Sequence, residues 1–211
     1  MTDFFTHCCR SWRPRLAAAC ACLSLLLLVS SRVHADAVPP EVTQLRVERS
    51  AEGLFLFASV RVELPAAVED ALLRGVPMFF VAEADVVRHR WYWSDRKVAS
   101  VQRHMRLAYQ PLTQRWRLNV APGIITSNSL GMTINQSFDT LPDAMAAVQR
   151  LSGWKIAEPG VVEPDSVHKV EFRFSLDLTQ LPRPFQIGTF GQSDWTIAVS
   201  ASKQISSEAL K

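Results

Sequence analysis

Hydrophobic and polar side chains alternate along several stretches of this chain, with the two-residue period of a β-strand that buries one face. The clearest stretch runs from Val170 to Leu178, where charged or hydroxyl side chains separate five apolar ones. Leu54 to Leu64 alternates in the same way, and shorter stretches lie at Thr43 to Val47 and at Trp195 to Ala201. The pattern predicts a strand in each of these four places.

Two segments carry apolar residues at helical spacing instead. Pro65 opens the first, and Gly75 follows it as a stop signal. The second begins at Thr140, whose hydroxyl is placed to cap the helix together with Asp143, and we expect it to end at Gly153. Its predicted apolar face consists of Leu141, Ala144, Met145, Val148 and Leu151.

Three more strands are predicted in the middle of the chain, at about 78–93, 97–109 and 115–120. Short turn-like pieces separate them. We expect Ser94-Asp95 and Pro111-Leu112 to form tight two-residue turns, which would join the three strands into consecutive antiparallel hairpins.

These turns fix a register, because turn length determines which residues face each other. Val86 would lie opposite Arg103, and Glu83, Arg106 and Arg117 would form one row across a polar face. Opposite charges in such a row contribute roughly 0.2–1 kcal/mol.

Arg103 falls on the apolar face in this register. A buried guanidinium without a partner is too costly to keep. We therefore expect Arg103 either to meet a carboxylate, Asp177 or Asp194, or to lie at an open sheet end. The predicted structural charge partners are Glu83, Arg103, Arg106, Arg117 and Asp177.

The elements together predict a mainly β fold, an antiparallel β-sandwich or strongly curved sheet of about seven to eight strands with two short α-helices. Ala121 to Thr133 has neither period, so we expect a loop there. The tail after about residue 205 is expected to be loose.

Residues 1–35 have the composition of a secretory signal peptide, with arginines before an apolar run from Leu16 to Val29. Val33-His34-Ala35 predicts cleavage after Ala35. The alternative is an uncleaved leader that anchors the protein in the inner membrane, facing the periplasm. The apolar run argues against it, because as a helix it would rise about 21 Å against roughly 30 Å of hydrocarbon.

Cleavage would leave one periplasmic domain, residues 36–211, without disulfides, because all four cysteines lie within the first 22 residues. It would also change the net charge. The whole chain has 23 basic and 20 acidic residues and a formal charge of +3, but the leader holds four of the basic and one of the acidic ones. The remainder has 19 of each and is formally neutral.

The charge is unevenly distributed along that neutral remainder. Between Arg88 and Arg117 there are eight cationic residues and one anionic residue, Asp95. Such a field steers an anionic partner toward one face. A lipid phosphate, an acidic glycan or an acidic protein surface would fit, whereas nucleic acid is not expected in the periplasm.

Aromatic residues lie beside these cations, in Trp91-Tyr92-Trp93. Arginine and tryptophan are enriched in binding hot spots. The candidate binding residues are Arg88, Arg90, Trp91, Trp93, Arg96, Lys97 and Arg115. The alternative is an ordinary solvated strand face whose surplus charge is partly neutralised by Glu83 and Asp85.

The sequence offers no candidate catalytic residue and no metal or cofactor site. His89, His104 and His168 are too scattered for a zinc signature. Gly191 to Trp195 resembles a nucleophile elbow only in its first three positions, since Trp195 replaces the second glycine.

Several segments spread along the chain form a recognisable combination: Glu69 to Leu72, Arg74 to Pro77, Trp91 to Ser100, Arg106 to Tyr109, Leu112-Thr113, Arg115 to Leu118, Phe138, Thr140-Leu141, Leu181 to Gln186 and Asp194-Trp195. Together they resemble the proteobacterial domain-of-unknown-function family 4390. The resemblance implies an exported envelope protein of unassigned activity with an accessory role in sensing, beside a membrane sensor histidine kinase, and it transfers no catalytic residue.

The leading hypothesis is therefore a noncatalytic periplasmic envelope module that binds an anionic partner or the external domain of a membrane sensor kinase. The first alternative is a periplasmic hydrolase acting on cell-wall or lipid material. The second is an anchored structural protein that keeps its leader.

Overall fold

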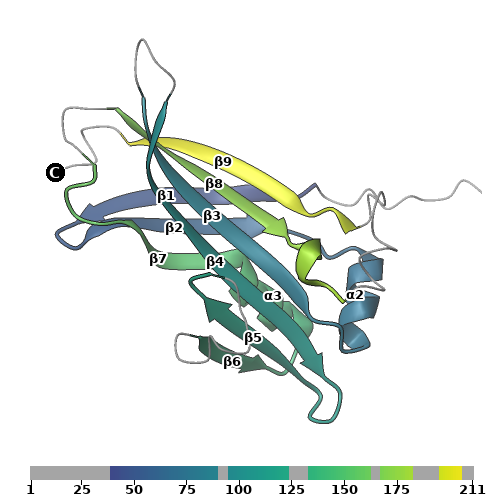
Figure 1. The fold of residues 1–211 in the computed structure, drawn as a ribbon. Coiled ribbons are helices and arrows are strands. Elements are labelled where there is room, and N and C mark those ends of the chain that lie inside the picture. The colour runs from purple at the N-terminus through teal and green to yellow at the C-terminus, as the bar shows by residue number, and fades with distance from the viewer. Residues whose placement is uncertain (1–38, 90–94, 124–132, 163–166, 183–194, 206–211) are drawn as a thin grey trace, which may run out of the picture. The chain divides into compact units, whose positions relative to one another are not determined.

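A computed structural model describes residues 39–89, 95–123, 133–162, 167–182 and 195–205 (Figure 1). The predicted leader, residues 90–94 and the predicted tail lie outside these ranges. The elements are β1 Glu41–Ser50, β2 Gly53–Arg61, α2 Ala66–Leu73, β3 Met78–Arg88, β4 Arg96–Gln110, β5 Arg115–Ala121, β6 Ile134–Phe138, α3 Leu141–Gln149, β7 Arg150–Ala157, β8 His168–Leu176, the 3₁₀ turn η1 Leu178–Gln180 and β9 Ala198–Ile205.

The strands form two antiparallel sheets. One has three strands in the order β1-β2-β7, and the other has six in the order β6-β5-β4-β3-β8-β9. The described residues thus hold nine strands and two α-helices, which confirms the predicted mainly β, antiparallel class.

The core lies between the two sheets, where the alternating residues of both inner faces meet. From the larger sheet, Phe80, Phe172 and Phe174 are fully buried, and Leu56 is fully buried from the smaller one. The rings of Phe80 and Phe174 stack with centroids 5.8 Å apart. Burying each of these side chains contributes about 1.5–3 kcal/mol.

The layers cover each other unequally. At one side β1 lies beside β9, and the Lys203 ammonium donates to the Leu45 carbonyl at 3.2 Å. At the other side β7 packs over β3 and β4, so β5 and β6 extend beyond the smaller sheet. Helix α3 packs against β5, β6 and β7 and covers part of this overhang (Figure 1).

The predicted hairpin register is wrong, although most of the predicted faces are correct. Arg103 pairs with Ala82 instead of Val86, a shift of four residues along β3. The link from β3 to β4 is longer than a two-residue turn, because β3 ends at Arg88 and β4 begins at Arg96. An even shift leaves the side chains of β4 from Ala99 onward on their predicted faces. Before Ala99, a bulge in β4 shifts the register by one more residue, so Lys97 lies on the outer face, where it contacts Asp85.

The row of Glu83, Arg106 and Arg117 is wrong for the same reason. Four residues separate β4 from β5, so Arg106 pairs with Asn119, and Arg117 pairs with Ala108. Neither arginine forms an ion pair with a described residue.

The second helix ends earlier than predicted. Its capping is confirmed, since the Asp143 backbone N–H donates to Thr140 Oγ1 at 3.3 Å, but the helix stops at Gln149 and the chain continues as β7. Gly153 lies inside β7 with φ +57°, where the register to β2 shifts. This bulge interrupts the strand period, which is why the sequence pattern did not predict β7.

The remaining predictions for this part of the chain have mixed outcomes. Pro65 precedes α2 as expected, and Gly75 follows it. Most of the Ala121 to Thr133 loop lies outside the described residues. Strand β6, directly after it, was not predicted from the sequence. Within the described ranges, no helix is long and apolar enough to cross a bilayer.

Candidate binding cleft

A cleft of about 520 Å³ opens where β5 and β6 extend beyond β7. Its walls are β4, β5 and β6 of the larger sheet, the end of α3 and β7 of the smaller sheet. The lining residues are Arg103, Met105, Leu118, Val120, Ala121, Pro122, Ile134, Gln136, Ala147, Arg150, Ser152, Trp154 and Lys155.

The floor of the cleft is apolar because it is the uncovered part of the inner sheet face. Met105, Val120 and Ile134 lie in one row across three paired strands. Met105 is buried, whereas 63% of Ile134 is exposed. The row therefore runs from the core outward to solvent.

The opposite wall is cationic. Arg150 and Lys155 belong to β7, and the Arg103 guanidinium from β4 lies 5.0 Å from the ring centroid of Trp154, also on β7. Cation–π contacts of this kind are worth about 0.5–2 kcal/mol. Burial lowers the pKa of Arg103, so its charge is held in a partly desolvated place.

None of the described residues that line the cleft is Asp or Glu. Lys155 has an acidic partner just outside the lining, Glu158, at 2.6 Å. Neither Arg103 nor Arg150 has a carboxylate partner within the described part of the chain. The cleft therefore combines an apolar floor with positive charge that the fold leaves largely uncompensated.

The two expectations for Arg103 have different outcomes. Asp177 does not meet it, because that carboxylate accepts hydrogen bonds from the Thr179 backbone N–H at 2.9 Å and from Gln180 at 2.7 Å, at the start of η1. Asp194 lies outside the described residues. Arg103 lies on the inner face, as the pattern predicted, and faces the opening between the layers.

The predicted binding residues do not gather in one place. Arg88 pairs with Arg96 across the end of β3 and β4, and Lys97 adjoins them. Arg115 lies at the other end of β4, on the order of 45 Å away along the strand. Arg90, Trp91 and Trp93 lie outside the described residues.

Two of these cations also have acidic partners. Lys97 contacts Asp85 at 2.8 Å, and Arg115 contacts Asp139 at 2.8 Å.

The outer face of the larger sheet carries a charge network around Asp85. The side chain of Arg173 reaches Asp85 at 2.7 Å and Glu83 at 3.2 Å, and the Ser100 hydroxyl donates to Asp85 at 2.6 Å. Burial acts to raise the pKa of Asp85, but hydrogen bonds from Lys97 and Ser100 and the charge of Arg173 lower it below its ordinary value. These contacts make the network a stabilising element.

His104 lies on the same outer face and is 6% exposed. Burial lowers its pKa, although the charges of Asp177 and Glu83 act in the opposite direction. Its Nδ1 has no hydrogen-bond partner in the structure described. Across the described ranges, no group of three or more His, Cys, Asp or Glu side chains is arranged to hold a metal ion.

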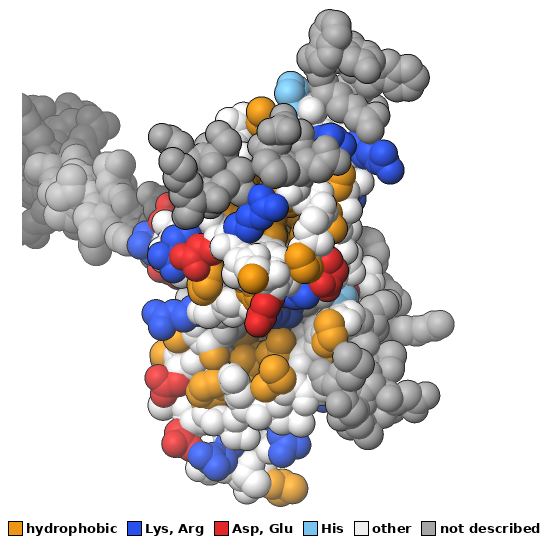
Figure 2. Space-filling view, turned by 90° about the vertical axis from the view of Figure 1, so that its left-hand side faces the viewer, with side chains coloured by type: hydrophobic (Ala, Val, Ile, Leu, Met, Phe, Trp, Pro, Cys, Tyr) orange, Lys and Arg blue, Asp and Glu red, His pale blue; other side chains and the backbone are white. Residues whose placement is uncertain are grey.

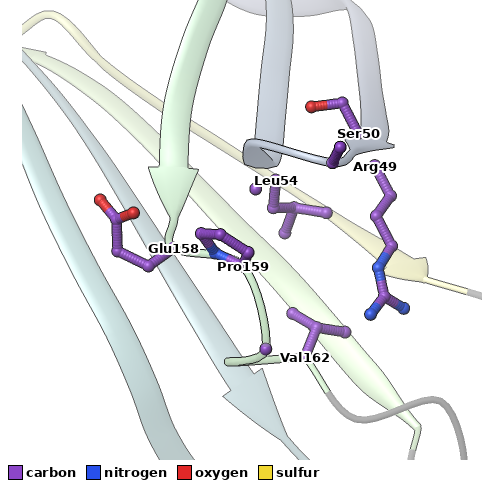
Figure 3. Close-up of a pocket in the computed structure, with 9 residues that line it drawn as sticks. Arg49, Ser50, Leu54, Glu158, Pro159 and Val162 are labelled. Atoms are coloured by element: carbon purple, nitrogen blue, oxygen red, sulfur yellow. The ribbon is translucent and has the colours of Figure 1, made fainter.

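A second, smaller hollow of about 240 Å³ lies where the β1–β2 turn meets the segment after β7 (Figure 3). Leu54, Pro159 and Val162 supply its apolar part. Arg49 and Glu158 bring opposite charges and lie on opposite sides of the view. Because both signs are present, this hollow favours an anionic ligand less than the cleft does.

The surface is mixed in character elsewhere too. On the face shown in Figure 2, hydrophobic side chains form a band, with both basic and acidic side chains above and below it. Apolar patches rimmed by polar groups commonly mark interaction sites.

These features define a two-layer antiparallel β protein with a cationic cleft at the uncovered side of its larger sheet. A family model matches residues 37–205, and the chain belongs to that family, a domain of unknown function (DUF4390). No curated protein and no solved structure matches the chain.

Within the cleft, sequence reasoning singled out only Arg103. Arg150 falls within the helix that the pattern predicts up to Gly153, and the bulge at Gly153 conceals the strand that carries Trp154 and Lys155. The signal that was present is the alternation of Trp154 and Ile156 with Lys155.

Proposed function

We propose that this protein is an exported, noncatalytic binding module of the cell envelope, and that its cleft takes an anionic partner. One observation carries the proposal. Arg103 and Arg150 line an apolar cleft in which no described lining residue is acidic. An anion placed there would supply the compensation that the fold does not provide.

The family resemblance adds an accessory role beside a membrane sensor histidine kinase. In that role, occupancy of the cleft would determine whether the module engages the external domain of the kinase. The alternatives of a hydrolase and an anchored structural protein receive no support from the cleft, whose charged lining residues are cations.

Photo-crosslinking from the cleft tests the binding function in intact cells. A photoreactive amino acid at Gln136, which lines the cleft, should capture a partner with the full chain. Capture should be lost when Arg103, Arg150 and Lys155 are all changed to Gln.

The matched control changes three exposed arginines outside the lining, Arg46, Arg61 and Arg117, to Gln. This control variant removes the same number of positive charges, and crosslinking from Gln136 should still capture the partner. Equal capture by both triple variants would contradict the proposal.

Export has its own test. The protein should be recovered from the periplasmic fraction with Asp36 as its first residue. Recovery from the cytosol with Met1 intact would contradict export while leaving the cleft unaffected.

A further inference from the structure

The two walls of the cleft differ in chemistry, and this difference narrows the class of ligand. The cations lie along β7 and at its contact with β4, whereas the apolar row of Met105, Val120 and Ile134 crosses from β4 to β6. A ligand that fills the cleft therefore meets positive charge on one side and hydrocarbon on the other.

Neither a purely polar anion nor a neutral apolar ligand satisfies both walls. A hydrated anion would leave the apolar row in contact with water, and a neutral hydrocarbon would desolvate Arg103 further without compensating it. The volume of about 520 Å³ is in the range of small-molecule sites. A ligand that has both a negative charge and a hydrocarbon chain would satisfy both walls.

We infer that the cleft binds a single-chain anionic amphiphile, with its acid group at Arg103 and Arg150 and its acyl chain over Met105, Val120 and Ile134. This inference rests on the proposed function and specifies its partner. The acid group would form charge-assisted hydrogen bonds with the guanidinium groups. The chain would cover the exposed side of Ile134.

Calorimetry on the full chain tests this with named probes, each kept below the concentration at which it aggregates. Decanoate, laurate and myristate vary the chain, and lauroyl lysophosphatidylglycerol replaces the carboxylate by a phosphodiester. Dodecyl maltoside has the chain without the charge, and inorganic phosphate has the charge without the chain.

Affinity should rise about fourfold for each buried methylene, or roughly 15-fold from decanoate to laurate. Dodecyl maltoside and phosphate should each bind at least tenfold more weakly than laurate. If laurate binds more strongly than the lysolipid, the natural amphiphile is a free fatty acid. If the lysolipid binds more strongly, the natural amphiphile is a product of phospholipid breakdown.

Two variants locate the site. Arg103→Gln with Arg150→Gln should weaken laurate at least tenfold and leave dodecyl maltoside unchanged. Ile134→Asn, at an exposed position where the fold does not depend on the side chain, should weaken all chain-bearing probes severalfold. Arg117→Gln, an exposed arginine on β5 outside the lining, is the control and should change nothing.

The outcomes separate the inference from the proposed function. If affinity is independent of chain length while crosslinking from Gln136 still depends on the cleft cations, the amphiphile is wrong and an anionic protein or glycan occupies the cleft. If the probes fail to bind and the cation variants also keep every crosslinked partner, both proposals fail.

Discussion

The guanidinium of Arg103 lies 5.0 Å from the ring centroid of Trp154, and this contact joins the two sheets at the edge of the cleft. Trp154 is 7% exposed, so its ring belongs to the core, while the charge it holds faces the opening. An arginine used only for stability would more usually have a carboxylate partner. The pairing therefore gives the ring a structural role and leaves the cation for the binding role that we propose.

Replacing Arg103 by Met should leave the free energy of unfolding unchanged within about 1 kcal/mol or raise it, because removal of a partly desolvated charge offsets the lost cation–π contact while the apolar stem stays. Urea denaturation monitored by tryptophan fluorescence measures this. A loss above about 2 kcal/mol would mean that the guanidinium is structural.

Replacing Asp85 by Asn should destabilise the fold by about 1–3 kcal/mol, since the carboxylate is 3% exposed and contacts both Lys97 and Arg173. The pKa of Asp85 is lowered from 3.8, so its contribution is complete above about pH 4 and is lost as the pH falls through the folded-state pKa. In the variant, the loss of stability below pH 4 should be smaller. A denaturation series from pH 2 to pH 7 gives the comparison, and identical slopes would refute the assignment.

His104 should make stability depend on pH in a different window. Burial lowers its pKa from 6.5, so the folded state favours the neutral ring. The contribution of His104 to the free energy of unfolding is then fully present above about pH 6.5. It falls as the pH drops from there toward the folded-state pKa, because the unfolded chain takes up the proton first. His104→Gln should remove this component between pH 7 and pH 5, and Asp85→Asn should retain it.

Gly153 should tolerate Asn better than Ala. Its φ of +57° favours glycine, and a Cβ placed there would contact nothing within 4 Å, so the penalty is conformational alone. Gly153→Ala should cost about 1 kcal/mol. Gly153→Asn should cost less, because Asn adopts this conformation more readily. Thermal unfolding ranks the three proteins, and a variant that unfolds far below this range would indicate strain beyond the backbone.

The position of Arg103 shows how far sequence reasoning reached in the candidate site. Alternation placed it correctly on the inner face of β4, because the two-residue period depends only on local backbone geometry. Its neighbours Trp154 and Lys155 were not recognised, because the bulge at Gly153 shifts the period and conceals β7. A cleft built from β4, β5, β6, α3 and β7 brings together residues about 50 positions apart in the sequence.

Three features follow from the sequence alone: the antiparallel β class, the cap of α3 at Thr140 and the faces that β3, β4 and β5 present beyond the bulge before Ala99. These depend on short-range chemistry: side-chain alternation, capping hydroxyls and turn residues. Tertiary packing instead sets the register, the pairing of Glu83 with Arg173 and the uncovered end of the larger sheet. The length of a loop and the packing of one layer over another set these features, and neither leaves a periodic trace in the chain.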